Sequence, residues 1–375
     1  MKRAFLFGAG AELDFGLSGG ADFAKKILLA KETEMVEINK AIKAYYKGKR
    51  ATLDAWYPTY AAEGWNETQL VRAALRKRSL DAGVKLKPDI LVAEVKRIMD
   101  PMNSAEKENL LSKNTSYMGL ADERYHTLIE PLTLGPKNFW SVINCYTRAY
   151  LLIVGQMLGL VNGVAKSDDY LNLLMNPSET YEKIVSIAKS KHDTESYYKA
   201  VREFAPGSLV ITTNYTPFAE MVTEQDTINI HGDFSLFESA RELRVYDVKE
   251  KGMILPETEV LFPYIAIQGG VKPVIERKQM SLYGNMVSAL ANSVDELVIV
   301  GYRINPDDNH LNSIIRSFLV EDKKKVIYFD YGSGNEEDIR RRLRLTISEA
   351  SGLTYIPLNR TETIVKFQNF LKTSK

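Results

Sequence analysis

Two polar side chains that can carry out acid–base chemistry follow short apolar runs in the second half of the chain. Asn214 comes after Leu209 to Thr212, and His231 comes after Thr227 to Ile230. Both runs are short and rich in β-branched residues, which is typical of buried strands. An amide and an imidazole at neighbouring strand ends can position a water molecule and move a proton. The alternative is that Asn214 closes a turn and His231 is a hydrogen-bonded core histidine.

The stretch between these two residues indicates a strand–helix–strand unit. Thr216 supplies a hydroxyl ahead of Pro217, which predicts an N-cap followed by proline at the first helical position. In open α/β sheets, ligands bind outside the carboxyl ends of the strands. We therefore expect Asn214 and His231 to lie at one edge of a sheet.

A glycine-containing loop follows the first expected strand, Ala4 to Phe7. The loop reads Gly8-Ala9-Gly10-Ala11 and leads toward a helical pattern. Glycine permits close backbone approach and free amides bind anions, so this loop is a candidate phosphate cradle. The spacing lacks the third glycine of the full dinucleotide fingerprint, and a purely structural turn is the alternative.

Two later apolar runs end in residues that suit nucleotide binding. Leu297 to Val300 ends in Gly301-Tyr302, where the glycine lets a ligand approach the backbone. Lys325 to Phe329 ends at Asp330, whose carboxylate is placed to bind a ribose hydroxyl. The alternative for Asp330 is that it caps or begins a turn.

From Lys31 to Pro206 a periodicity near 3.6 residues replaces the strand pattern. We expect helices over 22–47, 67–81, 89–99, 137–158, 177–190 and 194–204, and further helices over 274–291, 311–319, 336–348 and 362–371. The predicted fold class is α/β, with a Rossmann-like, mainly parallel sheet covered by helices on both faces. Residues 1–30 and 206–375 are expected to form this domain, and residues 31–205 a large all-helical insertion that serves assembly or partner binding.

Composition excludes several classes of protein. The chain of 375 residues has a net charge of +1, so no global field draws it to nucleic acid or a membrane. The single cysteine, Cys145, rules out internal disulfides and a four-thiolate zinc site. No second histidine, cysteine or acid stands at recognisable metal spacing near His126 or His192, and His310 is read as a helix-start residue, so we expect no metal.

Location and assembly follow from two further features. Met1-Lys2-Arg3 leads directly into a strand without a signal peptide, which predicts a cytoplasmic protein. The most apolar segment, Ala149 to Val164, is short for a membrane span and contains Gln156 and Asn162. We expect a core or subunit-interface helix there, and a homo-oligomer.

Four of these motifs, in this order, resemble those of the sirtuin fold: the Gly8-to-Ala11 loop, ITTNY with Asn214, IHG with His231, and LVIVGY near residue 300. The resemblance covers roughly residues 1–30 and 206–335. It is closer to the sirtuin-like NAD-cleaving proteins of bacterial antiphage defence than to protein deacylases. It implies a sirtuin-type sheet and an NAD hydrolase that releases nicotinamide and ADP-ribose and protects the cell by depleting NAD.

The resemblance also implies roles for particular residues. Asn214 would orient a water molecule and His231 would act as the base. The cofactor would be bound by Gly8, Ala9, Gly10, Ala11, Asp22, Thr213, Gly301, Tyr302 and Asp330. In this set Asp22, followed by Phe23, is a displaced remnant of the family's proline–aspartate–phenylalanine–arginine string.

Two departures from the sirtuin pattern narrow the expected activity. Sirtuins usually have an aspartate two residues after the catalytic asparagine, where this chain has Thr216, which bears on nicotinamide recognition. The four-cysteine zinc ribbon of the deacylases cannot form here, so water is the expected acceptor of ADP-ribose.

The resemblance further implies a partner: a HerA-type hexameric ATPase, which we prefer, or a short Argonaute. Two functions of other classes remain open. One is an NAD or ADP-ribose sensor without turnover, and the other is a scaffold whose helical insertion assembles a complex.

Overall fold

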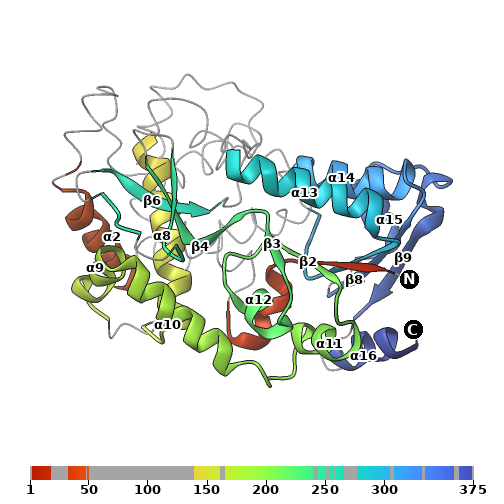
Figure 1. Cartoon of the computed structure of the whole chain (residues 1–375), viewed down its shortest axis with the longest axis horizontal. Coiled ribbons are helices and arrows are strands. Elements are labelled where there is room, and N and C mark those ends of the chain that lie inside the picture. The colour runs from red at the N-terminus through yellow and green to blue at the C-terminus, as the bar shows by residue number, and fades with distance from the viewer. Residues whose placement is uncertain are drawn as a thin grey trace, which may run out of the picture.

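The computed structural model describes residues 2–17, 33–47, 49, 139–160, 165–239, 244–250, 253–256, 259–265, 277–304, 308–331, 334–358 and 363–373. Asp22 and the expected helices at 67–81 and 89–99 lie outside the described residues. Within the described part, a large parallel sheet with its helices stands beside a smaller lobe of helices and antiparallel strands (Figure 1).

Six parallel strands form the main sheet. They are β1 (Arg3–Phe7), β2 (Leu209–Thr212), β3 (Thr227–Asn229), β7 (Glu296–Val300), β8 (Lys325–Asp330) and β9 (Leu353–Pro357). Their order in space is β3-β2-β1-β7-β8-β9. The chain thus winds outward from β1 in one direction and then from β7 in the other, which is the doubly wound Rossmann order. The predicted fold class is confirmed, although β9 had not been predicted.

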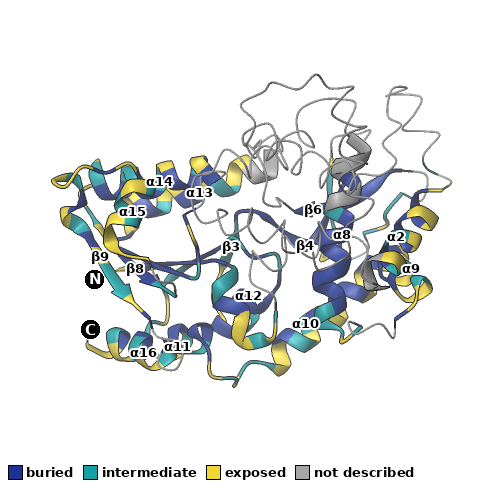
Figure 2. Cartoon of the chain, turned by 180° about the vertical axis from the view of Figure 1, so that it is seen from behind, coloured by how far each residue is buried: buried dark blue, intermediate teal, exposed yellow. Residues whose placement is uncertain are grey.

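Alternating side chains of the central strands enter two separate cores. Phe5 on β1 is in register with Val210 on one side and Val298 on the other. These three side chains lie in one buried cluster, whereas Leu6 and Ile299 lie in the other. The strands are buried on both faces, as a parallel sheet covered by crossover helices requires (Figure 2).

Each face of the main sheet has its own helices. One cluster includes buried side chains of α13 (Arg277–Ser293), α14 (Asn309–Val320) and α15 (Glu336–Arg342). The other includes those of α11 (Tyr197–Phe204), α12 (Phe218–Thr223) and α16 (Thr363–Thr373). Figure 1 shows the two groups on opposite sides of the sheet.

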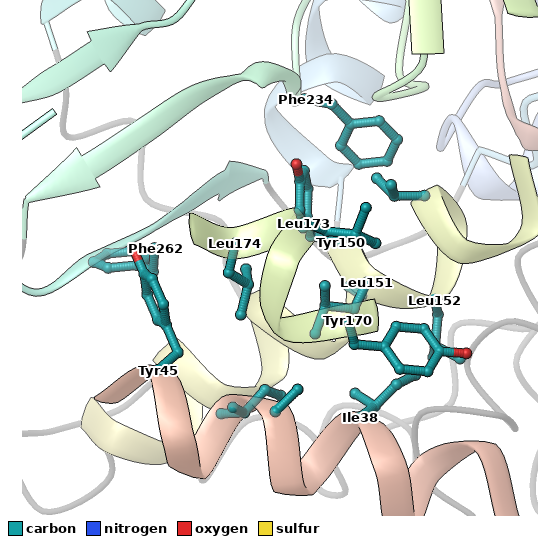
Figure 3. Close-up of a cluster of buried hydrophobic side chains, with 14 of the residues drawn as sticks. Ile38, Tyr45, Tyr150, Leu151, Leu152, Tyr170, Leu173, Leu174, Phe234 and Phe262 are labelled. Carbon is teal, nitrogen blue, oxygen red and sulfur yellow. The ribbon is translucent and has the colours of Figure 1, made fainter. Parts of the chain in front are cut away.

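Among the described residues, the smaller lobe combines an antiparallel sheet with four helices. Strands β4 (Gly232–Ser239), β5 (Val245–Asp247) and β6 (Leu261–Ile265) are ordered β5-β4-β6. Helices α2 (Thr33–Tyr46), α8 (Phe139–Met157), α9 (Ser167–Met175) and α10 (Pro177–Ser190) share a core with this sheet. Figure 3 shows Tyr150 of α8 beside Phe234 of β4, and Tyr45 of α2 beside Phe262 of β6.

No strand directly after His231 was predicted from the sequence. β4 occupies eight residues there, and all of them are buried. Its sequence, GDFSLFES, alternates only as far as Leu236 and is then out of phase, and the pairing with β6 also changes register within the strand, so its signal in the sequence is weak. Helix α9 was also missed, whereas α10 begins and ends where it was predicted.

Packing crosses the predicted boundary between residues 205 and 206. Tyr197 and Tyr198 of α11, on the insertion side, lie in the core under the main sheet. Phe234 and Phe262, on the other side of the boundary, pack with the helices of the smaller lobe. Helix α11 therefore packs with the main sheet, although it lies in the predicted insertion. The division into a catalytic domain and an assembly insertion stays a prediction.

Helix α8 corresponds to the most apolar segment of the sequence. Its residues Ile143 and Ala149 to Val154 are buried within the chain itself. The expected core helix is confirmed, but these apolar side chains are already covered and do not support a subunit interface. The homo-oligomer therefore stays a prediction. Among the described helices, none is long and apolar enough to cross a membrane.

Candidate functional site

The loops after β1 and β7 pack backbone against backbone at the point where the strand order reverses. The amide of Gly8 donates to the carbonyl of Val300, and that of Gly10 to the carbonyl of Gly301, each at 3.0 Å. Gly301 has a φ of +68°, and a Cβ there would lie 2.3 Å from the amide nitrogen of Ala11. Glycine at position 301 is therefore required both by conformation and by space.

This geometry accounts for Gly8 and Gly10 without the phosphate cradle that was expected from the sequence. The amides of Gly8 and Gly10 are bonded to the β7 end, and the amide of Ala11 donates to the carbonyl of Gly8 at 2.9 Å. These three amides are thus already used inside the protein, and the close approach of two backbones accounts for the glycines. Phosphate binding by the Gly8-to-Ala11 loop stays a prediction.

Asn214 is buried at the end of β2, beside the end of β1. Its side-chain nitrogen Nδ2 donates to the carbonyl of Gly8 and to the hydroxyl of Tyr198, each at 3.1 Å. Its backbone amide donates to Oγ1 of Thr212 at 3.0 Å. Because a carbonyl can only accept, the atom facing Gly8 must be the amide nitrogen. The oxygen Oδ1 is then the atom left to accept a hydrogen bond from a bound molecule.

A buried carboxyl group lies behind Asn214. Glu12, in the 3₁₀ helix η1 (Ala9–Phe15), is only 3% exposed. Its Oε1 accepts hydrogen bonds from Tyr198 at 2.9 Å and from Thr216 at 2.7 Å. Burial raises the pKa of Glu12 to about 7, although these hydrogen bonds partly oppose the rise. Glu12 thus has a titratable carboxyl next to the proposed catalytic asparagine.

Tyr198 fixes the direction of this hydrogen-bond chain. Burial raises the pKa of Tyr198 well above the usual value, so its hydroxyl stays protonated and donates a hydrogen bond to Glu12. The oxygen of the hydroxyl then accepts from Asn214. The ring itself lies edge-on to Phe7 at 4.7 Å and stacks with Phe15 at 5.8 Å between centroids. These apolar neighbours hold the hydroxyl in place and keep water from the carboxyl.

Thr216 does not cap the helix that follows it, contrary to the expectation from sequence. Helix α12 begins at Phe218, and Pro217 occupies the N-cap position without a side-chain cap bond. The hydroxyl of Thr216 donates to Glu12 instead. An N-cap side chain accepts from a backbone amide, whereas this hydroxyl acts as a donor to the buried Glu12.

His231 lies in the turn between β3 and β4 and is 4% exposed. The next residue, Gly232, has a φ of +84°, and a Cβ there would lie 2.1 Å from the carbonyl oxygen of Tyr264. The histidine nitrogen Nε2 is 3.3 Å from Oδ1 of Asp308, which is also buried. His310 is close by, with 6.2 Å between the two imidazole centroids. An aspartate beside Nε2 stabilises the protonated imidazole that a base becomes.

The contact between His231 and Asp308 spans the edge of the sheet. His231 follows β3, whereas Asp308 follows β7, and β2 and β1 lie between these strands. Three strand spacings amount to about 14 Å, so the two loops must converge over the ends of β2 and β1. A backbone bond of 3.1 Å from Phe234 to the carbonyl of Tyr215 joins the His231 turn to the Asn214 loop. The proposed catalytic residues therefore come from loops that meet at the carboxyl edge.

The remaining predicted site residues have defined places. The amide of Thr213 donates to the carbonyl of Phe7 at 2.9 Å, beside Asn214. The hydroxyl of Tyr302 is turned inward and donates to Asn312 at 2.9 Å. Asp330 lies one strand beyond β7, where its carboxylate accepts a hydrogen bond of 2.7 Å from Tyr355. Gly8, Thr213, Asn214 and Gly301 are thus brought together, and Asp330 lies at the same edge on the neighbouring strand, since Phe329 before it pairs with Val300.

Three residues of the site escaped the sequence analysis. Glu12 follows the glycine loop, Asp308 lies far beyond Asn214 in sequence, and Tyr198 lies 16 residues before Asn214, within the predicted helical insertion. Asp308 and His310 form an Asp-x-His pattern, which was a possible signal. Nothing local in the sequence indicates that Tyr198 turns toward Asn214, because that contact depends on how α11 packs under the sheet.

Comparison with known proteins gave structural likenesses only. No protein-family model matches the chain, and no curated protein matches it. A Sir2 homologue in complex with NAD is 10% identical with a TM-score of 0.33, over 54% of this chain and 75% of that chain. A sirtuin structure that concerns the basis of substrate affinity is 13% identical with a TM-score of 0.32, over 54% of this chain and 81% of that chain. A Sir2 complex with a p53 peptide and NAD⁺ is 13% identical with a TM-score of 0.32, over 54% and 79%. Scores of this size record partial overlap, so the strand order defines the fold here.

Proposed function

We propose that this chain cleaves the nicotinamide–ribose bond of NAD, with water as the acceptor. The observation that carries the proposal is the orientation of Asn214, whose amide nitrogen is bonded to Gly8 and Tyr198. This leaves a carbonyl oxygen at the carboxyl edge of the sheet, beside the strand-order reversal where nucleotides bind in such folds. The order of the four sirtuin-like motifs along the chain points to the same chemistry.

In the proposed reaction, Oδ1 of Asn214 accepts a hydrogen bond from a water molecule. This bond orients the water so that a lone pair of the water oxygen faces C1′ of the ribose. The bond between C1′ and the nicotinamide nitrogen breaks, and its electron pair goes to the nicotinamide. The transition state has oxocarbenium character. Water oxygen forms the new bond to C1′, and His231 takes the released proton. Asp308, 3.3 Å from Nε2, offsets the charge that His231 gains.

Glu12, Tyr198 and Thr216 serve as positioning residues in this proposal. They touch Asn214 or each other and lie behind it, in a buried network. Their hydrogen bonds fix which way the amide faces, and an amide turned by half a rotation would present hydrogens where the water must donate.

The wider biological role is a proposal that rests on the motif resemblance. NAD loss would act in antiphage defence, in the cytoplasm, with activity controlled by a HerA-type ATPase or a short Argonaute and by homo-oligomerisation. The test of the core proposal is incubation of the purified chain with NAD, with products resolved by chromatography. Nicotinamide and ADP-ribose in equal amounts are expected. Intact NAD, recovered bound to the protein with and without such a partner, would instead favour the sensor.

A further inference from the structure

A histidine–aspartate–histidine cluster lies beside the proposed reaction centre. His231 comes from the turn after β3, and Asp308 and His310 come from the start of α14. His231 and Asp308 are buried and His310 is half-buried, and one ligand atom from each lies within 4.8 Å of the others. Two imidazoles with one carboxylate are a donor set that zinc and related divalent transition metals favour.

The spacing within the cluster fits a metal ion. Two ligands at 2.0–2.1 Å from a tetrahedral zinc ion are separated by about 3.3 Å. Nε2 of His231 and Oδ1 of Asp308 are separated by 3.3 Å. His310, which is half-buried in the first turn of α14, must approach further. Tyr283 packs edge-on against His310, with 5.1 Å between the ring centroids.

We propose that His231, Asp308 and His310 form an inhibitory site for a divalent transition metal ion such as Zn²⁺. The three side chains supply three ligands, and a water molecule takes the fourth position. Nε2 of His231 has one lone pair, which can bind a metal ion or a proton but not both. An occupied site therefore removes the base, and the metal is an inhibitor and not a requirement of NAD cleavage. The inhibition rests on the proposed function, whereas binding itself does not.

Binding is tested directly on the full chain after treatment with a chelator and desalting. Co²⁺ is titrated and followed by its visible absorption, and Zn²⁺ by calorimetry. One equivalent should bind, with affinity reduced more than about tenfold in His310→Ala and in Asp308→Asn. His192→Ala is the matched control, because His192 lies elsewhere on the surface and already contacts Asp193 and Glu224. Equal affinity in the parent and His310→Ala, with both variants folded by circular dichroism, would overturn the proposal.

Inhibition is tested separately by nicotinamide release. Zn²⁺ should stop NAD cleavage by the parent chain, a chelator should restore it, and His310→Ala should need at least about tenfold more Zn²⁺ for the same inhibition. If Zn²⁺ binds one equivalent at these residues and cleavage continues unchanged, the inhibitory role is wrong. If the chain cleaves no NAD at all, the Co²⁺ titration still decides the site, and only the proposed function fails.

Discussion

The side-chain amide of Asn214 donates a hydrogen bond to the hydroxyl of Tyr198 at 3.1 Å. Tyr198 belongs to α11, which precedes β2 in the chain and packs under the main sheet. The bond links the proposed catalytic residue to a carboxyl group, because the same hydroxyl donates to Glu12. The direction in which Asn214 faces thus depends on a helix that the sequence placed in a different part of the molecule.

Replacing either proposed catalytic residue should abolish NAD cleavage without unfolding the chain. Asn214→Ala removes the water acceptor and His231→Ala removes the base, and each should lower the rate roughly a hundred- to ten-thousand-fold. The double variant should be little worse than either single one, because the two residues act on one step. Nicotinamide release is the measurement. Circular dichroism and NAD binding serve as controls, and two variants that cleave NAD like the parent would refute the assignment.

Tyr198→Phe tests the positioning network. The change keeps the ring between Phe7 and Phe15 but deletes the hydroxyl that links Asn214 to Glu12. We expect kcat to fall by at least about tenfold, with a smaller change in KM, since the amide loses its orientation and not the binding surface. Tyr197→Phe is the matched control, because its hydroxyl bonds to Tyr331, away from Asn214. Equal activity of the two variants would exclude the network from catalysis.

Glu12→Gln should change how stability depends on pH. The pKa of Glu12 rises from the ordinary glutamate value of 4.5 to about 7 in the fold, so between these values the folded chain holds a proton that the unfolded chain has lost. Its contribution to stability is therefore fully present below about pH 4.5 and is lost as the pH rises through about 7. Glutamine keeps the acceptor oxygen for Tyr198 and Thr216 and has no such loss.

The measurement is urea unfolding of the parent and Glu12→Gln at several pH values. The free energy of unfolding of the variant, relative to the parent, should increase between pH 5 and pH 8 by on the order of a few kcal/mol, since one pKa unit corresponds to about 1.4 kcal/mol. Asp168→Asn, on an exposed turn of α9, is the comparison for a general loss of one charge. A difference that stays constant over this range would show that Glu12 titrates normally.

Gly301→Ala should destabilise the chain far more than an alanine at a glycine with open space around it. The added Cβ would lie 2.3 Å from the amide nitrogen of Ala11, and residue 301 also has a positive φ. Gly207→Ala separates the two causes, since Gly207 has a φ of +76° and no atom within 4 Å of the added Cβ. Conformation alone costs about 1–2 kcal/mol. Thermal unfolding should show a larger loss for Gly301→Ala, and equal losses would mean that the loops can separate without cost.

Elements with strong local sequence signals were predicted correctly. β2 spans Leu209 to Thr212 and α10 spans Pro177 to Ser190, both as predicted. A short β-branched run and a proline at the first position of an apolar 3.6-residue pattern are local signals, and they act over a few residues. The order of such elements also determined the fold class, because strands alternating with helices form a parallel sheet.

Other elements had no such signal. β4 is buried throughout although half of its residues are polar or glycine, and its alternation is interrupted after Leu236. Helix α12 begins one residue later than predicted, and Thr216 donates to Glu12 instead of capping the helix. Local patterns indicate which conformation a segment prefers. They do not show that the hydroxyl of Thr216 donates to the carboxyl group of Glu12, which is distant in sequence.

The sequence by itself determined that Asn214 and His231 follow strands and that Gly8 and Gly301 lie in loops, because strand ends and turns are encoded locally. Only the tertiary structure decided what surrounds them. Glu12 and Asp308 come within hydrogen-bonding or ion-pair distance of the site through the strand order β3-β2-β1-β7 and the loops that cross it. The pKa of a carboxyl group depends on its burial and neighbours, and these are set by packing between residues that are 186 to 204 positions apart in the case of Glu12.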